Sequence, residues 1–322
     1  MIRISDNWNN LLKDYNIKDL EFLEEYAKLY GDAKLYFKEK NGDLIFLILL
    51  INKEYRDFET PYGYSSFYTS NPDKDFTEPF FEELFNLLKK ENLIAGFIRF
   101  NPFFPLPETN LFKIEYVREV FYIDLFGEYT KEFKSSVRNK IRLAERKNFC
   151  ISREKNEEEF LKFYKLYKNM IEEKKGREFL KFNEKYFLDL KNLKFSYLFN
   201  SYKNEEYFGG SLFLIEEGFN SYYHLSTVLK NEMSKGLSNL LLYKGCEFAK
   251  NLGSKIMILG GGIKDGKDGL SEFKRSFTTK SKPFCIGKVV LDEKIYDDLV
   301  KKYDTIYGTD EKFFLRYRNI LN

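Results

Sequence analysis

Residues 255–277 read KIMILGGGIKDGKDGLSEFKRSF, and this stretch decides the fold. Its apolar beginning predicts a strand at residues 255–259, which ends at Gly260, Gly261 and Gly262. Glycine adopts positive φ without strain and lets another group approach the backbone closely, and its amides can hold an anion or an oxyanion. Three successive glycines at a strand end therefore favour a binding or catalytic loop over a plain turn.

The helix predicted at residues 270–277 carries Phe273 and Lys274. A lysine that follows such a loop places an ammonium where negative charge develops on a reacting group, and a pre-positioned charge stabilises that transition state by several kcal/mol. The alternative is a surface lysine on a short helix, the usual situation of lysine.

The second half of the chain alternates short apolar strands with amphipathic helices, in the order βααβββαβαβ. Its predicted strands are 149–153, 195–201, 207–215, 219–227, 255–259 and 284–291, and its predicted helices are 157–173, 183–191, 235–252, 270–277 and one after Asp292.

The first half is also an α/β pattern. Its predicted helices are 20–30 and 78–90, and its predicted strands are 34–38, 44–51, 94–100 and 117–125. Two loops rich in proline and aromatic residues, at residues 60–66 and 101–107, lie between these elements. Proline holds a chain out of regular structure, and loops of this kind often form the wall of a pocket.

A helix predicted at residues 129–147 leads into the second half. Its apolar side chains recur at Phe133, Val137, Ile141 and Ala144, the spacing of an amphipathic helix. A length of 322 residues suits two domains. We place their boundary at Gly127, so the predicted domains are residues 1–127 and 128–322.

The same helix carries a stripe of positive charge at Lys134, Arg138, Arg142 and Arg146. Like charges four residues apart repel each other on a helix, and a bound anion relieves that repulsion. Arginine grips phosphate with two donors, so the stripe favours a phosphate or diphosphate partner. The alternative is a solvated helix face paired with acidic neighbours.

The only histidine, His224, lies in a predicted strand that reads Tyr222-Tyr223-His224-Leu225-Ser226-Thr227. Strand alternation puts Tyr222, His224 and Ser226 on one face and the other three on the opposite face. Histidine titrates near neutral pH, which makes His224 a candidate base. The alternative is a packed, hydrogen-bonded residue, which is commoner for a lone strand histidine.

The composition excludes several classes of function. The 53 basic and 50 acidic residues nearly balance, so no general electrostatic trap for DNA is expected. The longest apolar run, 44–51, is too short to span a membrane, which leaves only peripheral membrane contact, and no secretory leader is expected. Three widely spaced cysteines indicate free thiols in the cytoplasm and predict no metal site.

Several segments together resemble the FemABX branch of the GNAT superfamily and its BioF2-like acyltransferase relatives. In chain order they are Pro61-Tyr62-Gly63-Tyr64, Phe97-Ile98-Arg99-Phe100-Asn101-Pro102, Val137-Arg138-Asn139-Lys140-Ile141-Arg142, Gly209-Gly210, Tyr222-Tyr223-His224-Leu225-Ser226, Leu259-Gly260-Gly261-Gly262 and Phe273-Lys274. The resemblance implies an α/β (α+β) chain of two GNAT-like domains in tandem, each a mixed sheet flanked by helices.

The resemblance also implies roles for particular residues. Lys274 matches the lysine of the family's Phe-Lys pair, which serves the transfer step, and His224 is the second catalytic candidate. The expected substrate-binding residues are Tyr62, Tyr64, Arg99, Arg138, Arg142, Tyr223, Gly260, Gly261, Gly262 and Phe273.

The expected activity is transfer of an aminoacyl group from aminoacyl-tRNA to an amino group of a peptidoglycan precursor, with charged tRNA as co-substrate and no resident cofactor. One alternative is acyl-CoA-dependent N-acylation of an amino sugar or nucleotide sugar of a surface polysaccharide. Another is a binding protein on the same fold that has lost catalysis. The segment 230–237 holds a single glycine, so the pyrophosphate loop of CoA-using relatives is missing. The long coiled-coil arm of some Fem proteins is missing as well.

Overall fold

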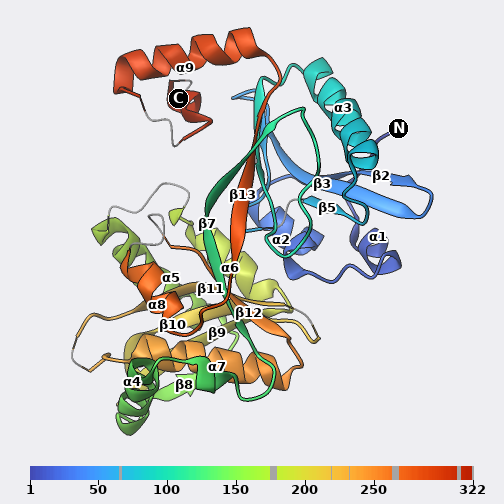
Figure 1. Cartoon of the computed structure of the whole chain (residues 1–322). Coiled ribbons are helices and arrows are strands. Elements are labelled where there is room, and N and C mark those ends of the chain that lie inside the picture. The colour runs from blue at the N-terminus through green and yellow to red at the C-terminus, as the bar shows by residue number, and fades with distance from the viewer. Residues whose placement is uncertain are drawn as a thin grey trace. The chain divides into compact units, whose positions relative to one another are not determined.

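The chain forms two compact units in the computed structural model (Figure 1), which describes residues 1–64, 67–174, 180–218, 220–231, 233–262, 268–309 and 313–320. Unit 1 consists of Met1–Val117 and Pro283–Asn322, and unit 2 consists of Arg118–Lys282. Each unit contains a mixed sheet flanked by helices. The predicted fold class is therefore confirmed.

The sheet of unit 1 has the strand order β1-β2-β3-β4-β6-β13, with β5 paired to β3. Its strands are β1 (Arg3–Ser5), β2 (Ala33–Lys40), β3 (Asp43–Asn52), β4 (Asp57–Glu59), β5 (Phe67–Thr69), β6 (Ala95–Arg99) and β13 (Ser281–Val290). Strands β2 and β3 form a hairpin whose two-residue turn is Asn41-Gly42, both at positive φ. An Asn-Gly pair is favoured there because the turn needs positive φ at both positions.

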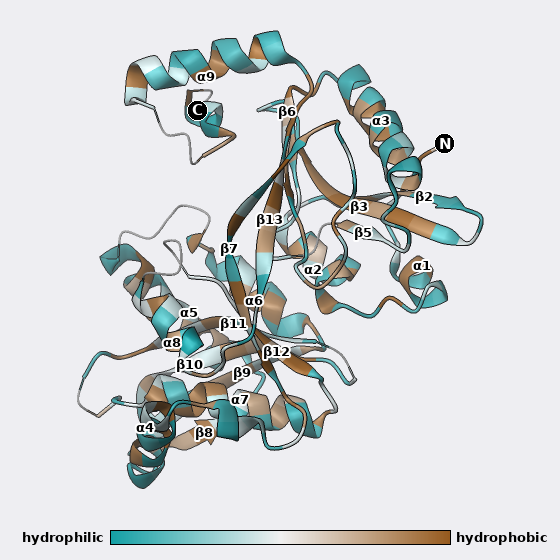
Figure 2. Cartoon of the chain, in the orientation of Figure 1, coloured by the Kyte–Doolittle hydropathy of each residue, from teal (hydrophilic) through white to brown (hydrophobic). Residues whose placement is uncertain are grey.

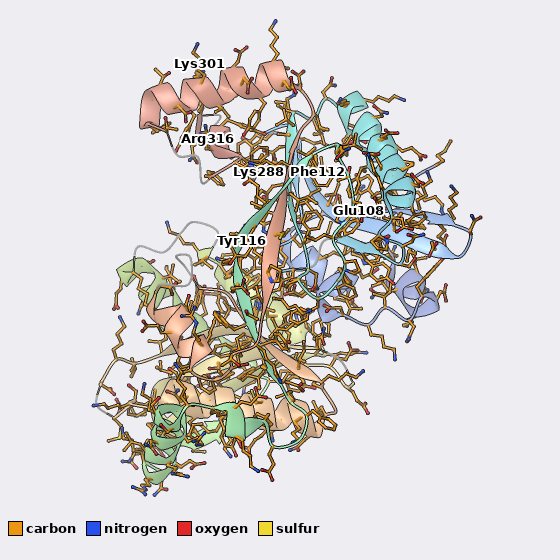
Figure 3. All side chains as sticks on the ribbon, viewed as in Figure 1. Glu108, Phe112, Tyr116, Lys288, Lys301 and Arg316 are labelled. Atoms are coloured by element: carbon orange, nitrogen blue, oxygen red, sulfur yellow. The ribbon has the colours of Figure 1, made fainter. Side chains whose placement is uncertain are left out.

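Strand β3 is buried on both faces, which explains its unbroken apolar sequence (brown in Figure 2). Side chains Ile45, Leu47 and Leu49 pack with helix α3 (Lys74–Lys90) in one cluster. The alternate residues Leu44, Phe46 and Ile48 pack in a second cluster with helix α1 (Asn9–Asp14) and its neighbours. The loop before β7 closes the first cluster, because Thr77 donates to the Glu108 carbonyl at 2.6 Å and Phe112 packs 4.9 Å from Phe81 (Figure 3).

The helix predicted at residues 20–30 is wrong as a continuous helix. The segment is divided into η1 (Leu20–Phe22), α2 (Glu24–Ala27) and η2 (Lys28–Tyr30). Three successive side chains of η1 are all buried. The backbone is extended at Leu23, with φ −66° and ψ 142°, so the helix cannot continue from Phe22 into Glu24.

Unit 2 has the strand order β7-β12-β11-β10-β9-β8. Its strands are β7 (Lys113–Asp124), β8 (Cys150–Ser152), β9 (Ser196–Lys203), β10 (Glu206–Leu214), β11 (Ser221–Val228) and β12 (Ile256–Gly260). Helices α4 (Ser135–Arg146) and α7 (Leu237–Asn251) cover one face, and α5 (Glu157–Glu173) and α6 (Glu184–Asn192) cover the other (Figure 1). The remaining elements include η3 (Tyr129–Glu132), α8 (Gly269–Arg275), α9 (Glu293–Tyr307) and η5 (Arg316–Ile320).

The units differ from the predicted domains of residues 1–127 and 128–322. The first boundary falls inside β7, and the last forty or so residues return to unit 1. Two pairings explain this: β13 completes the sheet of unit 1 by pairing with β6, and β7 completes that of unit 2 by pairing with β12. Each half of the chain thus supplies a strand to the other half's sheet. Among the described helices, none is both long enough and apolar enough to cross a bilayer.

The turn η5 of unit 1 is held by a buried ion-pair network. Arg318 on η5 donates two hydrogen bonds to Asp57, at 2.6 and 2.9 Å, and one to Glu59 at 2.6 Å. Tyr317 donates to the same Asp57 carboxylate at 3.1 Å. The side chain of Asp57 is 0% exposed, so its charge depends on these donors.

Replacing Arg318 with alanine should therefore lower the free energy of unfolding by about 3–5 kcal/mol, because a buried carboxylate loses its partner. Chemical denaturation measures this change. The control is Lys301→Ala, an exposed residue of α9 (Figure 3), which should change stability by less than about 0.5 kcal/mol. Equal effects of the two variants would contradict the structural role of the network.

Candidate functional site

The central parallel strands of unit 2 separate soon after they meet. Strands β11 and β12 pair only at Ser221 with Met257 and at Tyr222 with Ile258. Yet β11 runs on to Val228 and β12 to Gly260. Beyond the second pair the strands diverge, with His224 and Gly260 at the positions that a continued register would have joined.

The corresponding strands of unit 1 stay together. Strand β4 pairs with β6 along its whole length. The contact continues past the end of β4, because the Thr60 amide donates to the Phe97 carbonyl at 3.1 Å and the Arg99 amide donates to the Thr60 hydroxyl at 3.0 Å. Among the described residues, the parting of parallel strands is thus a feature of unit 2.

A β-bulge changes the predicted alternation of β11. Leu212 pairs with Leu225, but the next residue of β10, Phe213, pairs with Tyr223, so His224 is the inserted residue. The insertion brings Tyr223 and Ser226 onto the same face, where the tyrosine hydroxyl meets the hydroxyls of Ser226 and Ser211. The prediction that Tyr223 and Ser226 lie on opposite faces is wrong for this reason.

His224 meets Tyr186 of α6, with 2.7 Å between Nε2 and the tyrosine oxygen. Burial lowers the pKa of His224 to about 4. The imidazole is therefore neutral near pH 7, and it lies beside the point where the strands part. Tyr186 is a contact that the sequence pattern did not single out.

The three glycines have distinct local roles. Gly260 has a φ of 77°, and the register between β12 and β7 shifts just before it. A Cβ at Gly261 would lie 2.7 Å from the side chain of Arg118, and one at Gly262 would lie 1.7 Å from Ser271 Oγ. The sequence predicted that a substrate approaches the backbone closely at these glycines. At Gly261 and Gly262, side chains of the protein itself lie that close.

Lys274 reaches back from α8 to this glycine segment. Its ammonium nitrogen donates to the Gly261 carbonyl at 2.7 Å, and the residue is 7% exposed. Burial and the nearby Arg118 lower the pKa of Lys274 to about 7, while Asp268 acts in the opposite direction. Of the predicted site residues, Lys274, Phe273 and the three glycines are brought together.

Helix α8 is anchored by aromatic contacts. The Phe277 ring lies 5.2 Å from Phe273 and 5.0 Å from Phe133. The amide of Lys134, just after Phe133, donates to the Ser276 carbonyl at 2.9 Å. Phe273 is thus placed as a packing residue that fixes Lys274.

The predicted basic helix is divided into η3 and α4, because the chain is extended at Phe133 and Lys134. The guanidinium of Arg138 bonds the Phe133 carbonyl. Arg142 and Arg146 are exposed and make no ion pair with the part of the chain that the structure describes. The stripe therefore keeps three solvent-facing cations, Lys134, Arg142 and Arg146, while the Arg138 guanidinium bonds the chain just before α4.

The amino end of α7 is packed against α4. Its N-cap residue, Gly236, has a φ of 85°, and a Cβ there would lie 2.4 Å from the Lys140 carbonyl oxygen. Lys147 also donates to the carbonyls of Met233 and Lys235 in the preceding loop. A helix N-terminus attracts phosphate through open amides, and here the backbone of α4 lies beside it.

In unit 1 the predicted residues Tyr62 and Tyr64 belong to a loop held by a buried carboxyl group. Glu21 is 2% exposed and accepts hydrogen bonds from the Tyr64 amide and the Tyr26 hydroxyl. Tyr26 also donates to the Tyr62 carbonyl at 3.1 Å. The loop turns at Gly63, whose φ is 96° and where a Cβ would lie 2.6 Å from Glu21.

Arg99, the remaining predicted residue, is already paired. Its guanidinium donates to Glu59 at 3.0 Å and to the Thr60 carbonyl. Its charge is therefore neutralised within unit 1, which leaves it less suited to phosphate than the exposed Arg142.

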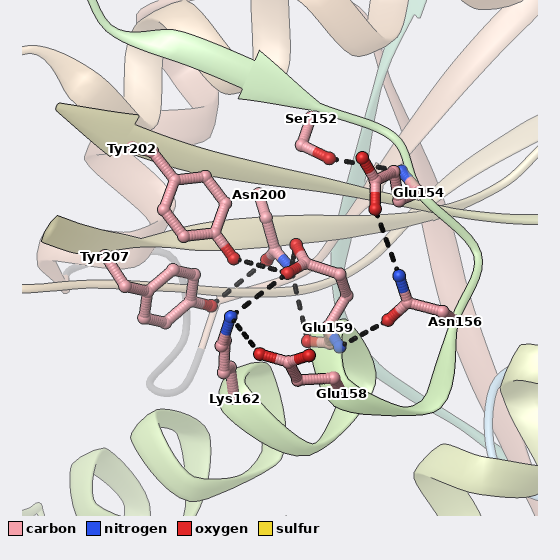
Figure 4. A network of polar contacts seen from close by, with 9 residues as sticks. All are labelled: Ser152, Glu154, Asn156, Glu158, Glu159, Lys162, Asn200, Tyr202 and Tyr207. Atoms are coloured by element: carbon pink, nitrogen blue, oxygen red, sulfur yellow. Dashed lines mark hydrogen bonds and ion pairs between the residues drawn. The ribbon is translucent and has the colours of Figure 1, made fainter. Parts of the chain in front are cut away.

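The face of the unit 2 sheet that α5 covers carries a polar network that the sequence did not predict (Figure 4). Glu159 of α5 accepts hydrogen bonds from the Tyr202 hydroxyl at 2.6 Å and from the Asn200 amide at 2.9 Å. Asn156 caps α5 by accepting from the Glu159 amide. The Asn-x-x-Glu spacing signals this cap, but the carboxylate turns to β9 instead. No cluster of metal-binding side chains occurs within the described residues.

Comparisons with known proteins bear on the fold. The chain matches no protein-family model and no curated protein sequence. The structure of FemX is similar, with a TM-score of 0.64 and 14% identity over 87% of this chain and 94% of FemX. L-PGS from Bacillus licheniformis gives a TM-score of 0.57 and 13% identity over 87% and 91% of the two chains.

A tandem GNAT protein from the clavulanic acid biosynthesis pathway gives a TM-score of 0.50 and 7% identity over 80% of this chain and 83% of its own. At such identities the likeness establishes the fold alone. The chain has the FemX-like GNAT fold, and the resemblance inferred from its motifs is confirmed at that level.

Replacing Glu21 with glutamine should stabilise the protein, and the gain should grow as the pH rises. Burial, and secondarily Asp19, raise the pKa of Glu21 well above its usual value. Such a group stabilises the fold fully below its unfolded pKa, and that contribution is lost as the pH rises through the folded pKa, by up to about 1.4 kcal/mol per pH unit. Glutamine can accept from the Tyr64 amide through its oxygen and donate to the Tyr26 hydroxyl through its nitrogen, and it cannot ionise.

Denaturant unfolding at pH 5 and pH 8 measures the effect. Glu25→Gln, an exposed carboxylate on α2, is the control and should show no such trend. A stability difference that stays constant between the two pH values would contradict a raised pKa at Glu21.

Proposed function

We propose that the chain is an acyltransferase that moves an aminoacyl group from aminoacyl-tRNA to an amino group of a peptidoglycan precursor. The observation that carries the proposal is the parting of β11 and β12 beside a glycine segment held by Lys274. Parted strands offer main-chain groups to an extended ligand. A lysine side chain held within a buried site can assist attack on a carbonyl carbon, so the transfer requires no Ser or Cys nucleophile.

The choice of aminoacyl-tRNA over CoA is supported by two features of unit 2. The amino end of α7, where a CoA diphosphate would bind, lies against the Lys140 carbonyl, and the segment 230–237 has one glycine. Arg142 and Arg146 are exposed on α4 and make no ion pair with a described residue. A polyanion gains affinity from such charges by releasing counterions.

The choice of a peptidoglycan precursor as acceptor rests on the likeness to FemX and on the tyrosine loop. The Glu21 carboxyl accepts from the Tyr64 amide and the Tyr26 hydroxyl donates to the Tyr62 carbonyl, so the backbone of the loop is fixed in advance. We assign this loop to acceptor recognition, and we place the reaction in the cytoplasm, where charged tRNA is found.

The test is a transfer assay with the purified chain, labelled aminoacyl-tRNA and a nucleotide-linked muropeptide. Product formation is expected, and Lys274→Ala should lower kcat/KM by about 100- to 1,000-fold, because a pre-positioned group is lost. Lys255→Ala, an exposed residue just before β12, should leave the rate unchanged. Product from acetyl-CoA and an amino sugar would favour the CoA-dependent alternative, and no turnover with any donor would favour a binding protein.

Charge reversal on α4 tests the donor separately. Arg142→Glu with Arg146→Glu should weaken tRNA binding and reduce its salt dependence by about two units of log K per log salt, because two phosphate contacts are lost. Lys165→Glu with Lys168→Glu changes the charge equally on α5 and should do neither. Equal weakening by both pairs would argue against a tRNA surface on α4.

A further inference from the structure

Two cationic side chains converge on the glycine segment after β12. Lys274 donates to the Gly261 carbonyl at 2.7 Å, and Arg118 of β7 donates to the Gly262 carbonyl at 3.0 Å. The Arg118 side chain also crosses Gly261, since a Cβ there would lie 2.7 Å from its Cδ. The two cations therefore occupy one small region, from two different elements.

The described acidic group that acts on Lys274, Asp268, is engaged in capping its helix. Asp268 caps α8 by accepting hydrogen bonds from the amides of Leu270 and Ser271, and it also accepts from the Ser271 hydroxyl at 2.8 Å. Within the described part of the chain, the Lys274 ammonium donates to the Gly261 carbonyl. Among the described residues, the charged groups that act on it are Arg118 from β7 and Asp268, the residue that caps its own helix.

This environment disfavours the charged form of Lys274. An ammonium that is 7% exposed loses most of its hydration, and among the described residues one carbonyl, that of Gly261, is bonded to it in return. The adjacent guanidinium adds repulsion, and arginine cannot relieve it by losing its own proton. Both effects favour the neutral amine, in agreement with the direction of the Lys274 pKa.

We propose that Lys274 works as a neutral general base and that Arg118 is the positioning residue that keeps it neutral. The inference rests on the proposed acyl transfer for its substrate, and it replaces the role of a fixed cation that the sequence suggested. Arg118 itself touches no reacting atom in this scheme.

The proposed acyl transfer includes two proton transfers, first to Lys274 and then from it. The acceptor amine attacks the ester carbonyl of the donor, and Lys274 takes a proton from the nitrogen as the carbon–nitrogen bond forms. The resulting ammonium returns that proton to the departing ribose oxygen as the carbon–oxygen bond breaks. Lys274 ends as the neutral amine, so one residue serves as base and then as acid.

The decisive variant is Lys274→Arg. Arginine keeps the positive charge but cannot give up its proton, so a base role predicts at least a 100-fold loss of kcat. A charge-only role predicts that more than a tenth of the activity remains, and this result would overturn the proposal. Circular dichroism and the melting temperature check that the variant is folded.

Arg118 is tested by the pH dependence of kcat/KM with one fixed pair of substrates. Arg118→Gln can still donate to the Gly262 carbonyl, and we expect the acidic limb of its profile to move up by at least half a pH unit. Arg118→Lys retains the charge and should leave that limb near the wild-type position. An unmoved limb in Arg118→Gln would overturn the role of Arg118.

A second readout needs no substrate. In protein labelled with ¹³C-lysine, the Lys274 resonance is identified by its absence from Lys274→Arg, and its titration should shift upward in Arg118→Gln. If this shift occurs but no acyl transfer is detected, the proposed function fails while the charge coupling stands. If transfer occurs and the titration does not move, the coupling fails alone.

Discussion

The site in unit 2 depends on the backbone of β12 where it turns away from β11. Strand β12 pairs with β11 at two positions only, and then Gly260, at positive φ, redirects the chain. The next two carbonyls are taken by Lys274 and Arg118. Because these side chains satisfy groups that a continued ladder would have used, the strands can part without leaving those carbonyls unbonded. The opening is thus maintained by polar contacts from β7 and α8.

Unit 1 shows what happens when such contacts are arranged differently. Its parallel strands β4 and β6 remain joined past the last ladder pair, through Thr60 and Arg99. The charges there neutralise each other, since Glu59 is shared by Arg99 and Arg318. This network of paired charges holds η5 to β4. The two units share a strand order. In unit 1, Thr60 and Arg99 join the parallel strands past the last ladder pair, whereas in unit 2, Lys274 and Arg118 bond the backbone where the parallel strands part.

Much of the fold could be predicted from local sequence. The hydrophobic periods predicted most helices and strands, and the triple glycine with Phe273-Lys274 indicated the segment where Lys274 meets Gly261. Long-range pairing could not be predicted in this way. The return of β13 to unit 1 depends on contacts with β6, nearly two hundred residues away. Likewise, the bulge at His224 follows from its register with β10, which no alternation pattern in β11 alone reveals.

The role of Lys274 illustrates the same limit in chemical terms. A sequence shows that a lysine is present, and the usual pKa of lysine then implies a cation. Its state in the fold depends on what surrounds it: one carbonyl, a neighbouring guanidinium and an aspartate already used as a helix cap. Arg118 is more than 150 residues distant in sequence and becomes a neighbour because β7 pairs with β12. The pairing of β7 with β12 therefore moves the unit boundary and also brings the Arg118 guanidinium to the site. In this chain, the topology of the sheet and the protonation of the candidate base are linked through a single strand.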